Sequence, residues 1–517
     1  MSSIPLWTRP NAQSRARDGA LAVAVGLLAL LLYAWSPTPW LWLPDGPHAL
    51  EHVARGEYLS YHFAYLPSAH ILRAVFSIEQ PADAARFASN VGAAIGLAFS
   101  YLLARHAGAR RMPTALGVAL IGCAPAVWFF AIQIEVHAVQ FGAVALGAWL
   151  TMVAPWRSRA RALLLAALGL GLAHCAHQST PALGPGWVLL VGFAARRQGV
   201  PWRPQQLLFV VGPILLAGLF AANTAIAALG APTLLFAEHA TVTTLVNAFH
   251  SPASATWWER DIARPLGYAL VGIALGFTML VREASGRGPG RAHAAAEARW
   301  ELGAIVVLLA VPTTLFAIWA VDNRGGYLAA STPFLVWLIA RAGGQQRATK
   351  LATGTHRSRI AVLAVLAIAV VAQVRWGWAD IDRESRRYDR ARHLDRAAAV
   401  VAQLPAGGVL ISFDGDNQSL RQFTGAVEEK NWLGAVLYSL QVDESPDVLV
   451  GRLMRDLDQV PPDTAILLEL SHRPLLARLA NEPFGAGLVA IEAALAERFH
   501  IEPIEGSPLP LARLRRR

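Results

Sequence analysis

The sequence predicts a polytopic, all-α membrane domain of about eleven transmembrane helices, followed by a small α/β domain outside the membrane. Of the 517 residues, 55% are hydrophobic and 15% are charged, and the mean hydropathy of +0.39 is too high for a soluble protein of this size. The apolar residues form blocks close to the ~20 residues that a helix needs to cross a bilayer. After Val374 the composition becomes charged and rich in turn residues, which indicates a second domain.

The first span is expected at Gly19–Trp35. It is interpreted as uncleaved, because the apolar run is long and the following SPTPWLWLP lacks a small-residue cleavage motif. The further spans are expected at residues 87–104, 113–131, 136–154, 161–176, 182–195, 206–228, 265–281, 302–320, 327–341 and 359–375. The spans at 161–176 and 182–195 are short and also fit one re-entrant pair, which leaves the topology unchanged.

The formal net charge of +10 comes almost entirely from arginine, since Lys350 and Lys430 are the only lysines. The arginines stand in clusters beside apolar runs, which is typical of membrane topology signals and not of nucleic-acid binding. Clusters occur between alternate pairs of spans, near residues 105–111, 157–161, 196–203, 282–299 and 341–359. The positive-inside rule therefore places these clusters and the N-terminus in the cytoplasm, and the intervening loops on the outer face.

The domain boundary is expected at residue 375. Residues 1–375 form the membrane domain, with an outer loop at 37–86, and residues 376–517 form the α/β domain, which an odd number of spans places on the outer side. In this second domain GGVLISFDGDNQS predicts a strand and turn, TAILLEL a second strand, and GAGLVAIEAALAERF a helix. Cys123 and Cys175 fall in apolar runs and are interpreted as core residues, so neither a disulfide nor a thiolate metal site is expected.

Acids and histidines are concentrated in the first outer loop, Leu43–His70. Asp45 could act as a general base or metal ligand at the membrane surface, or it could cap the helix that Asp-Gly-Pro precedes. His48, Glu51 and His52 have the i, i+3, i+4 spacing of one helical face. No further zinc ligand follows at a recognised spacing, so the polar face of an interfacial helix is preferred to a metal site.

Three more outer turns carry candidate residues. Glu135 and His137 lie in FFAIQIEVHAVQF, where the turn is apolar, so we expect Glu135 to face protein or a cavity and not solvent. His174 and His177, three residues apart, are expected on one helical face, where they line a polar cavity, bind a phosphate or fill the core. Arg324, beside glycines that permit close backbone approach, suits a lipid phosphate or is neutralised by Asp322.

These stretches resemble, in order, the bacterial protein O-mannosyltransferase-like family, a member of the GT-C superfamily of lipid-dependent membrane glycosyltransferases. The resemblance rests on an early acid at Asp45, the triplet Glu135-Val136-His137, the stretch GLGLAHCAHQSTPALGPG and the turn Gly415-Asp416-Asn417. His137 replaces the family's usual tyrosine. The family's His-Pro-Pro-Gly segment is represented only by SYHFAYLP, with His62.

The resemblance implies a GT-C-like fold in a bacterial inner membrane and inverting transfer of a sugar from a polyprenyl-phosphate donor on the outer face. Asp45 would be the base and Glu135 a supporting acid near the same cavity. The substrate or its lipid phosphate would be bound by the remaining candidates, namely His62, His137, His174, His177 and Arg324. The resemblance assigns no definite cofactor, and a divalent cation could share the phosphate's charge.

The acceptor implied by the resemblance is a protein, a glycan or a lipid, and the second domain would help to bind it. Two other classes of protein are compatible with the composition. A transporter or flippase of lipid-linked intermediates would need polar residues through the bilayer midplane, whereas here they gather at one end of the spans. A non-catalytic membrane scaffold predicts that alanine at Asp45 and Glu135 leaves function intact.

Overall fold

The structure is a computed structural model, in which the chain divides into two compact units. The first comprises Met1–Thr38 and His52–Glu384, and the second Pro39–Glu51 and Ser385–Arg517. The residues described are 12–37, 49–50, 52–53, 56, 63–177, 179–229, 258–286, 292–319, 326–344, 355–387, 395, 398–413, 428–432, 435–436, 444–470, 473, 483–507 and 509–517.

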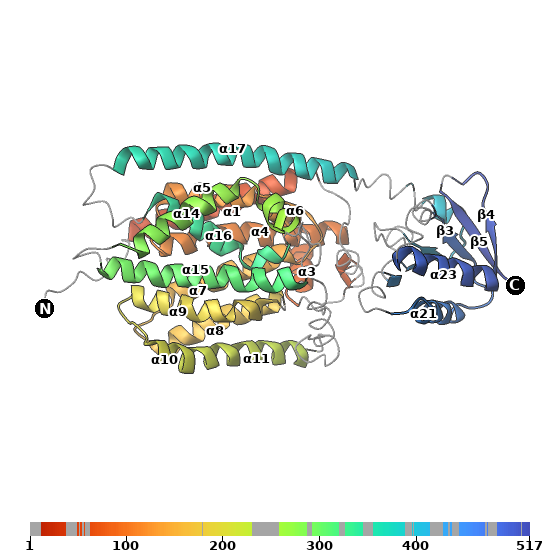
Figure 1. Cartoon of the computed structure of the whole chain (residues 1–517), viewed down its shortest axis with the longest axis horizontal. Coiled ribbons are helices and arrows are strands. Elements are labelled where there is room, and N and C mark those ends of the chain that lie inside the picture. Colours follow the sequence, from red (N-terminus) through yellow and green to blue (C-terminus); the bar gives the residue numbers. More distant parts are fainter. Residues whose placement is uncertain are drawn as a thin grey trace. The chain divides into compact units, whose positions relative to one another are not determined.

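The first unit is helical, and most of its helices run in nearly the same direction (Figure 1). Its long helices are α1 (Ala12–Trp35), α4 (Pro81–His106), α7 (His137–Val153), α8 (Arg159–Ala176), α11 (Gly212–Ala228), α14 (Ala269–Ala284), α15 (Ala292–Trp319) and α17 (Thr355–Arg387). The shorter ones are α3 (Tyr65–Val75), α5 (Arg111–Gly122), α6 (Pro125–Ile132), η1 (Thr180–Leu183), α9 (Gly184–Arg197), α10 (Pro204–Gln206), η2 (Leu207–Val211), η4 (Trp258–Ala263), α13 (Arg264–Leu266), η5 (Gly326–Ala330), α16 (Thr332–Ala340) and η6 (Arg341–Gly343).

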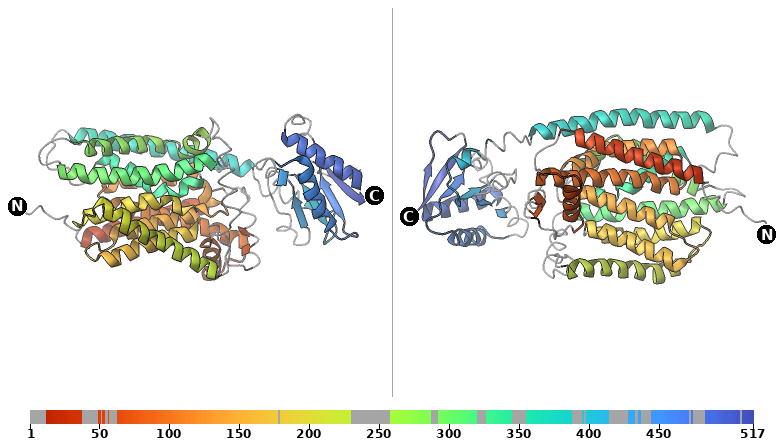
Figure 2. Two further views of the ribbon diagram at one scale, coloured as in Figure 1. Left: turned by 60° about the horizontal axis from the view of Figure 1, so that its bottom comes forward. Right: turned by 180° about the vertical axis from the view of Figure 1, so that it is seen from behind.

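Helices α11, α8, α7, α4 and α1 pack as successive neighbours, and Figure 2 shows α1 beside α4 from behind. Glycines let two of these pairs approach backbone to backbone. A Cβ on Gly142 of α7 would lie 2.6 Å from the Gly92 carbonyl oxygen of α4, and one on Gly169 of α8 would lie 2.6 Å from that of Gly147 in α7. Real Cβ atoms essentially never come this close, so both crossings require glycine.

Each expected span is largely helical among the described residues, but fewer helices have the length and composition of a membrane span. Among the described residues, five helices are long and apolar enough to cross a membrane: Gln13–Trp35, Pro81–His106, Arg159–Ala176, Pro204–Ala228 and Ser358–Arg386. The expected span at 113–131 is two helices, Arg111–Gly122 and Pro125–Ile132, bent by 61°, and would make a sixth. The expectation of eleven spans therefore remains a prediction.

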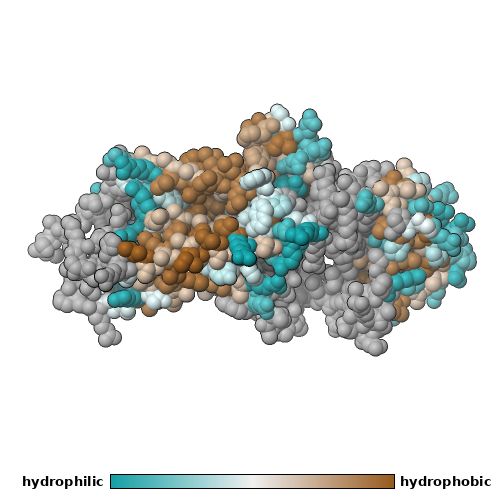
Figure 3. Space-filling view, turned by 90° about the horizontal axis from the view of Figure 1, so that it is seen from above, coloured by the Kyte–Doolittle hydropathy of each residue, from teal (hydrophilic) through white to brown (hydrophobic). Residues whose placement is uncertain are grey.

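The outer helices expose apolar side chains as a membrane domain does. Leu28 in α1, Phe209 beside α11 and Val371 in α17 are 68%, 71% and 72% exposed. Figure 3 shows the side on which α17 lies, where a band of apolar side chains is bordered by hydrophilic ones at both ends. Apolar surface on this scale would be unfavourable in water and suits the hydrocarbon region of a bilayer.

The second unit contains a five-stranded sheet in the order β2-β1-β3-β5-β4. Its strands are β1 (Val409–Ser412), β2 (Glu428–Asn431), β3 (Ile466–Glu469), β4 (Phe499–Pro503) and β5 (Leu511–Arg516). β2, β1 and β3 are parallel, while β5 and β4 are antiparallel to their neighbours. The two strands and the helix expected from sequence are present as β1, β3 and α23 (Pro483–Arg498).

Two faces of this sheet are covered, which explains why β1 and β3 are continuous apolar runs. Val409 and Ile411 of β1 pack in a core with α21 (Pro446–Asp458) and α23, whereas Leu410 packs with Leu404 on the opposite face. Helix α21 begins where Ser445 caps it by accepting a hydrogen bond from the Val448 N–H, and Pro446 takes the first helical position.

Candidate functional site

The candidate site is built around the four-residue connection between α6 and α7. Helix α6 ends because Gln133 turns to an extended conformation, and α7 begins at His137. Glu135 in this connection is 1% exposed, and its Oε1 accepts a hydrogen bond from the Val136 N–H at 2.9 Å. Glu135 therefore lies within protein and not in a solvated turn.

Helix α4 holds this connection in place. Ser89 Oγ donates to the Glu135 carbonyl oxygen at 3.0 Å, and Asn90 Nδ2 donates to that of Ala131 at 2.6 Å. Tyr65 of α3 donates to the Ala85 carbonyl oxygen at 2.8 Å and lies 3.4 Å from Ser89 Oγ. Buried hydrogen bonds from α4 thus fix the backbone on which Glu135 sits, and Tyr65 of α3 in turn contacts Ser89.

Two histidines meet next to this connection. The imidazole rings of His137 and His177 stack with their centroids 5.3 Å apart, and Phe130 meets the His137 ring edge-on at 5.0 Å. A Cβ on Gly326, in η5, would lie only 2.7 Å from His137 Cδ2. The backbone at Gly326 therefore passes directly against His137.

A short chain of hydrogen bonds orients the two rings. His137 Nδ1 lies 3.5 Å from Gln140 Oε1, and Gln140 Nε2 donates to Ser179 Oγ at 2.8 Å. The Ser179 N–H donates to His177 Nδ1 at 3.1 Å. This network assigns the proton of a neutral His137 to Nδ1 and that of a neutral His177 to Nε2.

His174 does not join this pair. Helix α8 ends at Ala176, and His177 is extended, so the expected common helical face for His174 and His177 is wrong. The His174 ring is 1% exposed and faces Asn223 of α11. Within the described part of the chain neither His174 nitrogen has a hydrogen bond of good geometry. The structure therefore stacks His177 on His137, two residues after Glu135, and leaves His174 in a separate helix contact.

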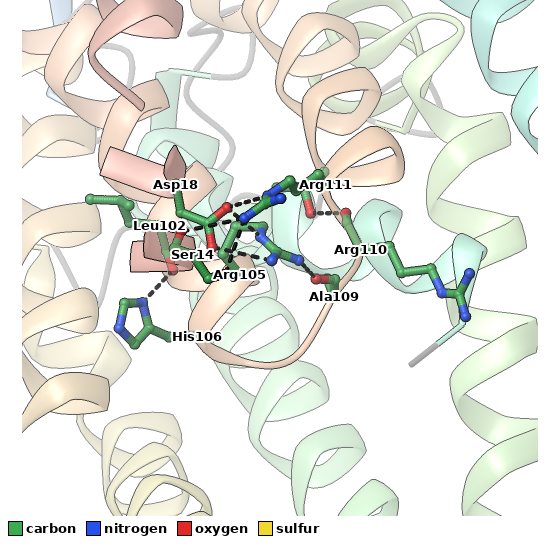
Figure 4. Close-up of polar contacts among 9 residues, drawn as sticks. Ser14, Asp18, Leu102, Arg105, His106, Ala109, Arg110 and Arg111 are labelled. Carbon is green, nitrogen blue, oxygen red and sulfur yellow. Dashed lines mark hydrogen bonds and ion pairs between the residues drawn. The ribbon is translucent and has the colours of Figure 1, made fainter. Parts of the chain in front are cut away.

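The opposite end of α4 carries a second polar cluster, shown in Figure 4. Asp18 of α1 accepts hydrogen bonds from Arg105 at 3.1 and 3.2 Å and from Arg111 at 2.7 Å, and Arg111 also donates to Ser14. Ser89 and Arg105 are 16 residues apart on α4, which is about 24 Å at 1.5 Å per residue. The site at Glu135, His137 and His177 and the Asp18 cluster thus lie at opposite ends of α4.

Further buried ion pairs join the other helices. Arg197 of α9 pairs with Glu297 of α15 at 2.8 Å, and Arg341 pairs with Glu301 of α15 at 2.9 Å and also with Glu283. Sequence reasoning used these arginines only as topology signals and missed their acidic partners. A signal was available, because glutamates inside a predicted membrane domain need a cationic or hydrogen-bonding partner.

Several predicted site residues lie outside the described residues, namely Asp45, His48, Glu51, His62, Asp322, Arg324 and the turn Gly415-Asp416-Asn417. Of His48, Glu51 and His52, which have helical spacing in the first loop, only His52 is described. Among the residues that the structure does describe, no group of three or more histidine, cysteine, aspartate or glutamate side chains is arranged to hold a metal ion.

Comparison with known proteins gives information on the fold. No family model and no curated protein matches the sequence. The chain is similar in structure to ArnT from Cupriavidus metallidurans bound to undecaprenyl phosphate, with a TM-score of 0.57, 13% identity and 98% of each chain covered. ArnT in the apo state gives 0.54 and 14%, covering 96% of this chain and 98% of that one.

A third similar structure is the arabinofuranosyltransferase AftD from Mycobacteria, with a TM-score of 0.48, 14% identity, and coverage of 96% of this chain and 41% of that one. At these identities the likeness to ArnT establishes the fold alone. The chain is an integral membrane protein that shares the fold of ArnT.

Proposed function

We propose that this protein is a membrane glycosyltransferase that moves a sugar from a polyprenyl-phosphate donor to an acceptor at the outer face of the membrane. The observation that carries the proposal is the buried pair Glu135 and His137, with the partly buried His177 ring stacked on His137, at the end of α4 opposite Arg105. A buried acid and imidazole are costly in a membrane domain, so they indicate a functional site. The fold is shared with ArnT, which has been captured with undecaprenyl phosphate.

The proposed reaction is an inverting displacement. Asp45 takes the proton of the acceptor hydroxyl, whose oxygen bonds to the anomeric carbon. The bond between that carbon and the lipid phosphate breaks, and the phosphate leaves with the bonding electrons. Asp45 is assigned from its place in the first outer loop and from the family resemblance.

The leaving phosphate needs donors and positive charge as the bond breaks. The Ser179 N–H donates to His177 Nδ1, so a neutral His177 carries its proton on Nε2, the nitrogen that we assign to the phosphate. Gly326 packs against His137 and lies two residues after Arg324, so Arg324 is our choice for the cation. Glu135 is assigned a positioning role because it holds the start of α7. His62 and His174 are secondary candidates for contacts to the donor, and a divalent cation could assist at the phosphate.

The test is a transfer assay with full-length protein in lipid, using a panel of polyprenyl-phosphate sugars with protein, glycan and lipid acceptors, with and without EDTA. The key variants are Asp45→Asn, Glu135→Gln and, as an exposed control, Glu79→Gln. We expect turnover that Asp45→Asn abolishes, Glu135→Gln lowers and Glu79→Gln leaves unchanged.

Turnover that survives Asp45→Asn would contradict the assignment of the base and move it to Glu135. Loss of turnover on adding EDTA, restored by Mg²⁺ or Mn²⁺, would add a metal to the scheme. Donor movement across vesicles without sugar transfer would replace the proposed enzyme with a transporter. No effect of any variant in cells that depend on the protein would favour a scaffold.

A further inference from the structure

A groove on the outside of the helical unit lies away from the candidate site. Its volume is about 710 Å³, and it is lined by Tyr268, at the start of α14, and by α17 residues that include Ile368, Val371, Ala372, Arg375 and Trp376. We name this feature the α17 groove. The groove lies along a largely exposed helix, since only 22% of the most apolar 18-residue stretch of α17 is buried.

The contacts of α17 hold one side of this helix against the unit. On its inner side Gln373 donates to the Cys123 carbonyl oxygen at 3.3 Å and accepts from the Ala269 N–H at 3.2 Å. Trp378 packs on Trp128 with ring centroids 6.0 Å apart. These contacts fix one side of the helix, whereas Ile368, Val371 and Arg375 are exposed and line the groove.

The walls and one end of the α17 groove differ in chemistry. Ile368, Val371 and Ala372 are apolar, and Arg375 follows Ile368 by seven residues, which is about 10 Å along a helix. Trp376, next to Arg375, donates from Nε1 to the Arg264 carbonyl oxygen at 3.3 Å, and tryptophan is typical of the membrane interface. An apolar channel therefore leads to a cationic end at the level where lipid headgroups lie.

The charge at this end is not neutralised within the described structure. Arg375 and the neighbouring Arg264 are both exposed, and neither side chain has a carboxylate partner among the residues described. Two of the three acids further along α17, Asp380 and Glu384, pair with Arg383. The arginine end of the groove thus has a net positive charge that an anionic headgroup would complement.

We infer that the α17 groove binds one acyl chain of an anionic glycerophospholipid of the surrounding bilayer, with Arg375 contacting its phosphate. A soluble phosphate would leave the apolar walls unused. A zwitterionic lipid would place its own cation near Arg375 and Arg264. This inference does not depend on the proposed glycosyltransferase activity, because the groove shares no residue with the site at Glu135.

The test is lipid binding by native mass spectrometry of the full-length protein in detergent, titrated with phosphatidylglycerol or phosphatidylcholine. We expect tighter binding of phosphatidylglycerol, and we expect Arg375→Gln to weaken it about fivefold, the effect of one basic residue at a membrane surface. The charge-matched control is Arg359→Gln on the same helix, outside the groove, which should leave binding unchanged.

A second variant, Ala372→Trp, should fill the groove and weaken binding of both lipids. Because Arg375 is exposed, its substitution does not disturb the core, so a folded Arg375→Gln protein keeps the test valid if Ala372→Trp fails to fold. Equal binding of the two lipids, or equal effects of Arg375→Gln and Arg359→Gln, would overturn the inference. A preference for undecaprenyl phosphate over phosphatidylglycerol that Arg375→Gln removes would overturn it too, in favour of a polyprenyl chain.

Discussion

His137 and His177 join the start of one helix to the end of another through a direct ring contact, with centroids 5.3 Å apart and planes inclined by 29°. His137 is the first residue of α7, and His177 directly follows α8. Only His177 has its Nδ1 engaged by a backbone N–H, that of Ser179, among the hydrogen bonds described. The two rings therefore differ in which nitrogen can donate, a property that substitution can probe.

The first prediction concerns His177→Phe, which keeps a ring for stacking but removes both nitrogens. If His177 donates to the leaving phosphate, the transfer rate should fall by about 10²-fold, with little change in the thermal unfolding midpoint. His500→Phe, at an exposed position in β4, is the matched control and should leave the rate unchanged. An unchanged rate in His177→Phe would show that the ring serves only to pack.

The second prediction concerns Gly326→Ala. The new Cβ would lie 2.7 Å from His137 and 2.8 Å from Phe130, so one of these rings must move, at a cost of about 1–3 kcal/mol. We expect a lower thermal unfolding midpoint in detergent and a lower transfer rate together. Gly303→Ala in α15, where a Cβ meets nothing within 4 Å, should be neutral or slightly stabilising. Equal behaviour of the two variants would refute the close packing at His137.

The third prediction concerns Gln373→Leu. This buried side chain connects the Cys123 carbonyl oxygen with the Ala269 N–H, and leucine would leave both groups without it, at about 1–3 kcal/mol for each buried group. We expect the unfolding midpoint to fall and proteolysis around α17 to increase. Gln80→Leu, at an exposed position, is the control for the same change of chemistry. A midpoint equal to that of the control would contradict the connecting role.

The fourth prediction concerns Asp18→Asn. Arg105 and Arg111 both donate to this carboxylate, and the amide keeps its shape but loses its charge, which should cost about 2 kcal/mol. Asp83→Asn removes the exposed partner of Arg86 and should cost less than about 1 kcal/mol. Unfolding of both variants in detergent at low and high salt is the measurement. Equal losses would show that the Asp18 cluster is no stronger than a surface pair.

Helix positions could be predicted from the sequence because apolar runs are a local signal, but their ends and bends could not. Pro125 starts a new helix inside the run expected as one span at 113–131, since proline cannot donate the hydrogen bond that would continue α5. Conversely, the span at 359–375 and the charged segment after it form a single helix, α17. Helix α17 continues through Trp376-Gly377-Trp378, where Gly377 packs tightly against Trp128.

The second unit and the site show the same limit. Strand β2 has the sequence EEKN, and its place beside β1 at the edge of the sheet is a tertiary effect that no strand pattern reveals. At the site, the burial of Glu135 followed from its apolar surroundings in sequence. The stacking of His137 on His177, the departure of His174 towards Asn223 and the contact with Gly326 depend on how distant segments meet.

The crossing of α7 and α8 at Gly147 and Gly169 controls the separation of the helix ends that carry the histidine pair. His137 lies ten residues before Gly147, and His177 lies eight residues after Gly169, so each helix end lies roughly 12–15 Å from the crossing at the helical rise. A methyl group added at the crossing would push α7 and α8 apart. The displacement would be larger at the two rings, because they lie far from the crossing. The arrangement of the histidine pair is thus sensitive to substitutions at a helix crossing more than a full helical turn away from either ring.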